Sequence, residues 1–231
     1  FSPAYSNCSS CASAASTTHW PKIISSPVPS SSCKNAPGGS IPRSGCDHRA
    51  RASTPEEPLW LVLLGAVTDA VAAFERDPSI ADRVIVFWHG RSNWPVECRN
   101  FNARKDPVAA RRAFDLPSRF VLFDTGAQLK MPVEEVERRY VPLGPLGAHL
   151  RDIRNRHPSL LLPDKGLFDL GDVAALIDPA CAPWEKTAAP SVDEKLKYDF
   201  TRPRGELIRI KEVDPARSFD LLEESLRRLK P

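Results

Sequence analysis

The sequence predicts an α/β fold with a mostly parallel sheet and helices on both faces. From residue 56 onward, apolar runs of strand length alternate with segments of helical length. The three clearest runs are apolar throughout, as expected of strands that are buried on both faces. Alternation of strands and helices with short connections is typical of parallel sheets, because each crossover helix covers one face.

The predicted strands are continuous apolar runs that end at turn residues. They cover residues 59–64, 84–88 and 120–123, with a shorter strand at 207–210. The turns that follow the first three are Gly65, His89-Gly90 and Asp124-Thr125-Gly126. Active sites of parallel sheets lie beyond the carboxyl ends of the strands, so we expect the functional residues in these turns and the loops after them.

Capping residues and prolines predict where the helices begin. Thr68 is expected to cap a helix that stops at Asp77-Pro78, and Asp106-Pro107 to open a helix that runs to Phe114. Further helices are predicted at residues 134–139, 146–156, 172–177 and 218–229.

The chain divides into two unlike segments, residues 1–55 and 56–231. The first is rich in Ser and Pro, has no apolar period, and contains one acidic residue, Asp47. We expect it to be a disordered leader, or an artefactual stretch joined to a true coding region. The alternatives are a small zinc site or disulfides among its cysteines, which are Cys8, Cys11, Cys33 and Cys46.

Composition argues against two classes of partner. The formal net charge of +3 is too small to indicate nucleic acid, and the longest apolar run, residues 59–66, is far shorter than the ~20 residues that span a bilayer. The chain begins at Phe1, so we expect a start that is missing or removed. Since no signal-peptide pattern is visible, a cytoplasmic location is expected.

Two short motifs carry groups suited to a sugar and a cation. Asn100-Phe101-Asn102 follows the second strand, and its amides both donate and accept, which suits vicinal sugar hydroxyls. Turn-forming asparagine is the structural alternative. Phe168-Asp169 precedes a predicted helix, so the Asp169 carboxylate can either cap that helix or bind a hard cation.

The order of four motifs resembles the inosine-uridine-type nucleoside hydrolases. The family has Gly-Pro-Leu-Thr-Asn, Glu-Phe-Asn followed by Asp-Pro-Glu-Ala-Ala, Leu-Asp-Val-Thr, and His-Asp or Trp-Asp. The corresponding segments here are residues 65–69, 100–102 with 106–110, 123–126, and 168–169. The resemblance covers about residues 51–220 and implies a nucleoside-hydrolase-like, Rossmann-like fold.

The resemblance implies hydrolysis of the N-glycosidic bond of a ribonucleoside, with a bound calcium ion, by a homo-oligomer. Asp169 and a backbone carbonyl at Thr125 or Gly126 would then bind calcium. The amides of Asn100 and Asn102 would hold the ribose, and Phe168 would stack on the base. This assignment requires the side chains of Asn102 and Asp169 to face one hollow.

The sequence departs from the family pattern in two places. The family's Asp-rich opening motif, which supplies further carboxylates and the general base, does not occur in residues 1–55. The fold is therefore expected to be incomplete at its amino end, with poor calcium affinity. Phe168 replaces the acid, and His89 is the candidate substitute, with an ordinary turn residue as its alternative. A non-catalytic ribose- or nucleoside-binding module is the alternative function, and a structural α/β domain is a more distant one.

Overall fold

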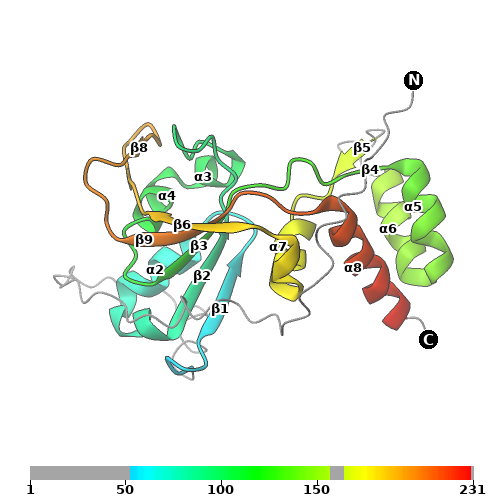
Figure 1. Cartoon of the computed structure of the whole chain (residues 1–231), viewed down its shortest axis with the longest axis horizontal. Helices are drawn as coiled ribbons and strands as arrows, with labels where there is room; N and C mark the ends of the chain where they lie inside the picture. Colours follow the sequence, from blue (N-terminus) through cyan, green and yellow to red (C-terminus); the bar gives the residue numbers. More distant parts are fainter. Residues whose placement is uncertain (1–52, 157–163, 230–231) are drawn as a thin grey trace, which may run out of the picture.

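The computed structural model describes residues 53–156 and 164–229, which are built around a five-stranded sheet (Figure 1). The strands lie in the order β1 (Leu59–Leu63), β2 (Val84–His89), β3 (Arg119–Phe123), β9 (Glu206–Ile210) and β6 (Trp184–Ala188). The first four are parallel, and β6 pairs antiparallel with β9. The predicted mostly parallel sheet is confirmed, with β6 as an antiparallel addition.

Helices lie on both faces of this sheet (Figure 1). The α-helices are α2 (Thr68–Arg76), α3 (Phe101–Lys105), α4 (Pro107–Ala113), α5 (Val133–Arg139), α6 (Pro145–Arg156), α7 (Leu170–Ile177) and α8 (Pro215–Arg228). Short 3-10 helices are η2 (Pro78–Arg83), η3 (Val141–Leu143) and η5 (Pro179–Cys181). Two ribbons pair β4 (Lys130–Pro132) with β5 (Asp164–Gly166) and β7 (Ser191–Val192) with β8 (Tyr198–Asp199).

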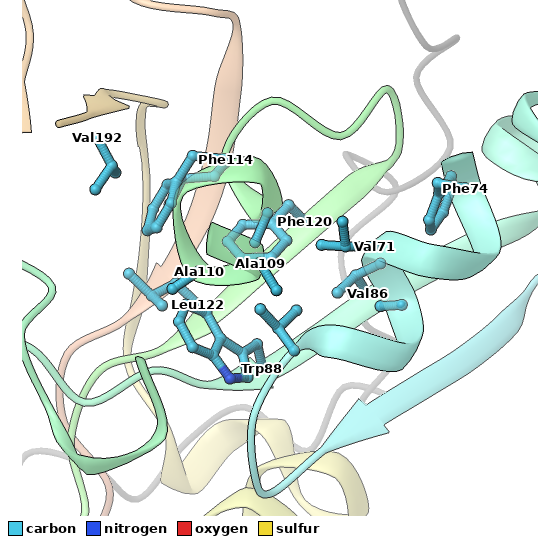
Figure 2. Packing of buried hydrophobic residues seen from close by; sticks show 14 of the residues in the cluster. Val71, Phe74, Val86, Trp88, Ala109, Ala110, Phe114, Phe120, Leu122 and Val192 are labelled. Atoms are coloured by element: carbon cyan, nitrogen blue, oxygen red, sulfur yellow. The ribbon is translucent and has the colours of Figure 1, made fainter. Parts of the chain in front are cut away.

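One face of the sheet packs against α2 and α4 around the indole of Trp88 (Figure 2). Trp88 is fully buried, and its ring centroid lies 6.3 Å from that of Phe114 and 6.4 Å from that of Phe120. Its indole N–H donates to the Gly65 carbonyl at 3.0 Å. Trp88 therefore belongs to the core and also links the carboxyl ends of β1 and β2.

The opposite face belongs to a second core cluster, which includes residues of α7 and continues to α8 and α5. Phe87 and Phe123 stack there with a centroid separation of 6.0 Å, in the same cluster as Ala174 of α7. Consecutive residues of β2 alternate between the two faces, so this strand contributes to both cores. All six residues of β2 are buried, as its unbroken apolar sequence predicts.

The caps of two helices differ from the prediction. Val67, not Thr68, occupies the N-cap position of α2, and the Thr68 hydroxyl instead donates to Asp106 Oδ2 at 2.7 Å. Asp106 does cap α4, because its Oδ1 accepts from the Ala109 N–H at 2.9 Å. Asp169 occupies the N-cap position of α7, but its side chain makes no capping hydrogen bond. The capping interpretation of Asp169 is therefore wrong.

Several expectations concern residues outside the described ranges. Residues 1–52 hold nearly all of the predicted leader and the four cysteines considered for zinc or disulfides. The cysteines within the described ranges, Cys98 and Cys181, are buried free thiols. None of the helices in those ranges has the length and apolar character required to cross a membrane.

Candidate active site at the carboxyl ends of the strands

The register of the parallel strands brings three chain segments together at one edge of the sheet. Leu63 pairs with Trp88, and His89 pairs with Phe123, so the residues that follow each strand are neighbours. A cavity of about 820 Å³ opens at this edge, a size within the usual range of ligand pockets. Its lining is Leu64, His89, Arg91, Ser92, Asn93, Arg99, Asn100, Phe101, Asn102, Arg104, Phe168 and Asp169.

Asn102 and Asp169 line this same cavity although they come from α3 and from the turn before α7. The Asn102 amide nitrogen donates to the carbonyl of Leu64 at 3.1 Å and to that of His89 at 2.8 Å. Both amide hydrogens therefore fasten α3 to the ends of β1 and β2. The Asn102 carbonyl oxygen is the part of the side chain that remains for a ligand.

Asn100 combines a structural role with a place on the cavity lining. Its Oδ1 accepts from the Ala103 N–H at 2.9 Å and caps α3. Its Nδ2 is buried and has no hydrogen-bond partner among the described residues. An unsatisfied buried donor is costly, so a ligand oxygen that accepts from Asn100 would relieve that cost.

His89 is held by a buried carboxylate. Its Nδ1 lies 2.6 Å from Asp172 Oδ2, and its side chain is 9% exposed beside a fully buried Asp172. Burial raises the pKa of the Asp172 carboxyl to about 6, although the hydrogen bond with His89 acts in the opposite direction. With Nδ1 directed at Asp172, Nε2 is the ring nitrogen left for a ligand in the cavity.

A buried ion pair fixes the loop that follows β2. The Asp124 side chain is 1% exposed, and its Oδ2 accepts from Arg209 Nε at 2.6 Å. Its Oδ1 accepts from the Ser92 N–H at 2.5 Å. Arg209 in turn donates to Glu185 at 2.9 Å and lies over the ring of Trp94. Asp124 therefore ties the cavity loop at Ser92 to β3, β9 and β6.

The structure brings Gly126 and Phe168 together beside His89, whereas Thr125 is engaged elsewhere. Gly126 has φ +103°, and a Cβ added to it would lie 3.1 Å from the Phe168 carbonyl oxygen and 3.8 Å from His89 Cε1. The buried Thr125 hydroxyl accepts a hydrogen bond from the Gln128 side-chain nitrogen at 3.1 Å. Neither Thr125 nor Gly126 is on the cavity lining, and the Gly126 carbonyl already accepts from the Leu129 N–H at 3.1 Å.

Among the described residues, one group has the composition of a cation site, namely His89, Asp169 and Asp172, whose candidate ligand atoms lie within 4.8 Å of one another. This donor set does not fit calcium, which takes about six to eight oxygens and avoids nitrogen. One ligand is an imidazole, and the nearest carboxylate oxygen is already hydrogen-bonded to it. An imidazole with two carboxylates suits a first-row divalent metal better.

Sequence reasoning missed Asp172 and three arginines of the cavity, Arg91, Arg99 and Arg104. The spacing of Asp169 and Asp172 places both near one side of the first turn of α7, and that signal was present in the sequence. The pairing of Asp172 with His89 joins residues far apart in the chain, and no local pattern reveals it. Arg91 and Arg99 precede the Asn100-Phe101-Asn102 motif and Arg104 follows it, but the motif drew attention to amides alone.

No model of a known protein family matches the chain, and no curated protein matches it. Solved structures do match the chain. A purine-preferring ribonucleoside hydrolase from Gardnerella vaginalis is similar with a TM-score of 0.68 and 19% identity, over 90% of this chain and 74% of that chain. A plant nucleoside hydrolase is similar with a TM-score of 0.65 and 20% identity, over 78% of this chain and 65% of that chain.

An inosine-uridine preferring nucleoside hydrolase from Bacillus anthracis is similar with a TM-score of 0.62 and 16% identity, over 79% of this chain and 64% of that chain. The match therefore spans less than two thirds of the plant and Bacillus enzymes. Identities this low establish fold and nothing finer. The α/β fold of this chain is that of the nucleoside hydrolases.

Proposed function

We propose that the chain binds a ribonucleoside in the cavity at the ends of β1, β2 and β3 and hydrolyses its N-glycosidic bond. The observation that carries this proposal is the shared position of Asn102 and Asp169 on one cavity, beside His89. Three solved structures with this fold are of nucleoside hydrolases. One of these enzymes is purine-preferring and another inosine-uridine preferring, so the proposal extends to ribonucleosides as a class rather than to one base.

The polar groups of the cavity can recognise a ribose. The Asn102 carbonyl oxygen accepts from one hydroxyl, and the Asn100 amide donates to another. The exposed Asp169 carboxylate accepts a further hydroxyl hydrogen bond. The Phe168 ring, which also lines the cavity, provides a surface on which a nucleobase stacks.

His89 is the group that can move a proton. If the Nδ1–H donates to the Asp172 carboxylate, the neutral ring accepts a proton at Nε2, and the imidazolium donates one there. The first form activates water, and the second protonates a departing base. Asp172 holds the ring and stabilises its positive charge. The hydrolysis proposed here assigns no step to calcium, because the donor set does not fit that ion.

A binding module without turnover is the second candidate, and two observations favour it. Both donor hydrogens of Asn102 are used by backbone carbonyls, so its contact with ribose is limited to the carbonyl oxygen. The candidate cation cluster also contributes two carboxylates only. A cavity with these contacts can retain a ligand through hydroxyl and stacking interactions without hydrolysing it.

Ribose release from inosine, uridine and adenosine tests the proposal, with binding measured by calorimetry on the same samples. We expect ribose release that falls about 10²-fold or more in His89→Ala, as for loss of a general acid or base. His149→Ala is the matched control, because His149 is exposed on α6 and is not on the cavity lining. Binding without ribose release identifies the module, and the absence of both refutes the proposal. Added calcium is expected to leave both measurements unchanged.

A further inference from the structure

The rim of the cavity carries three arginines. Arg91 and Arg99 come from the loop between β2 and α3, and Arg104 comes from α3. All three are exposed, and none forms an ion pair with a carboxylate of the described residues. The Arg91 guanidinium lies 5.0 Å from the centroid of the Phe168 ring. Asp169 is the one acidic residue on the lining, so the cavity surface is cationic.

Several arginines elsewhere in the described structure have carboxylate partners, whereas others, such as the exposed Arg228, have none. Arg209 binds Asp124 and Glu185, Arg139 binds Asp220 and Glu223, and Arg217 binds Asp178 and Glu224. Such pairing is what a chain with nearly balanced charge produces. The feature that sets the cavity apart is the presence of three unpaired guanidinium groups on one lining that has a single acidic residue, an arrangement suited to an anionic ligand.

An uncharged ribonucleoside offers no anion to these groups. A phosphate ester does, because the guanidinium fork matches two phosphate oxygens and its hydrogen bonds are charge-assisted. The amides of Asn100 and Asn102 lie on the same lining and suit the ribose hydroxyls. We infer that the cavity takes a phosphorylated ribose, as a nucleoside 5′-monophosphate or as ribose 5-phosphate, in preference to a free nucleoside. This inference rests on the proposed function, since it names the substrate class of the same site.

The phosphate takes no part in the bond changes. In a nucleoside monophosphate the C1′–N bond breaks, the water oxygen bonds to C1′, and a proton from water goes to the base. The products are a free base and ribose 5-phosphate, with the phosphate still esterified. His89 remains the proton carrier, and the arginines hold the end of the substrate remote from the reacting carbon.

Calorimetric titration tests the inference with four probes: inosine, inosine 5′-monophosphate, ribose 5-phosphate and inorganic phosphate. At low salt we expect the monophosphate to bind at least about tenfold more tightly than inosine, as for one or more charge-assisted hydrogen bonds. Single Arg91→Gln, Arg99→Gln and Arg104→Gln variants should reduce that ratio, and added salt should reduce it too. Arg228→Gln is the control, because Arg228 is exposed on α8 and is not on the cavity lining.

The outcomes separate this inference from the proposed function. Equal affinity for inosine and its monophosphate overturns the inference and leaves nucleoside binding in place. Ribose 5-phosphate that binds as tightly as the monophosphate supports the inference with the sugar phosphate as the recognised part. Inorganic phosphate that binds as tightly as either ester overturns it, since the cavity is then a plain anion site. Failure of all four probes to bind refutes both proposals.

Discussion

Replacement of Arg209 by methionine tests the ion pair that anchors the cavity loop. The change keeps most of the alkyl chain and removes the guanidinium, so the Asp124 carboxylate stays buried with the Ser92 N–H as its remaining partner. The Asp124 side chain is 1% exposed and that of Arg209 is 16% exposed, so solvent cannot replace the lost charge. Leaving one charge of a buried pair without its partner lowers the free energy of unfolding by about 3–5 kcal/mol.

A second variant also removes the negative charge of Asp124. In Asp124→Asn/Arg209→Met the buried carboxylate is gone, so the loss should be smaller than in Arg209→Met alone. Arg227→Met is the control, because the Arg227 side chain in its pair with Glu223 is 61% exposed and such pairs contribute about 1 kcal/mol or less.

Urea denaturation at pH 7, followed by circular dichroism, gives the three free energies. The reasoning is refuted if Arg209→Met loses no more than Arg227→Met, or if the double variant is less stable than Arg209→Met. In the first case the buried pair would have no net role. In the second, the carboxylate would be stabilising without its partner.

Two further predictions concern residues that lie next to His89 and Phe168, behind the cavity lining. Burial raises the pKa of Asp172 to about 6, so its proton stabilises the fold at low pH and this contribution is lost as the pH rises through about 6. From pH 5 to pH 8 the unfolding free energy should fall by about 1–2 kcal/mol relative to Asp172→Asn, and a difference independent of pH would contradict this. Gly126→Ala should cost about 1–3 kcal/mol, because φ is +103° and the new Cβ meets the Phe168 carbonyl. Gly65→Ala, with nothing within 4 Å of its Cβ, should change thermal stability by no more than about 0.5 kcal/mol, and equal losses in the two variants would contradict this explanation.

The buried parallel strands could be predicted from the sequence because each is a continuous apolar run. Residues 59–64, 84–88 and 120–123 correspond to β1, β2 and β3 within one residue at each end. By contrast, the sequence of β6, Trp-Glu-Lys-Thr-Ala, has no such run. Its hydrogen bonds to β9 make it a strand, and its charged residues pair with charges beyond β6. Strands that depend on tertiary pairing leave little local signal.

The candidate site shows the same division between local and tertiary information. Asn102 and Asp169 could be placed at strand ends by their position after predicted elements, and the structure puts both on one cavity. The partner of His89 could not be identified, because Asp172 belongs to a helix that packs on the sheet from a distant part of the chain. The sequence also gave no indication that the Asn102 amide would be used by the carbonyls of Leu64 and His89.

The cores on the two faces of the sheet share one strand, because β2 contributes side chains to both. Val86 and Trp88 pack toward α2 and α4, while Ile85 and Phe87 pack toward the helices opposite. Unfolding of the helices on either face would therefore expose one side of β2, whose other side packs against the opposite core. The two layers should melt as one cooperative unit. Amide protons in the middle of β2 and β3 should then exchange only when the whole domain opens.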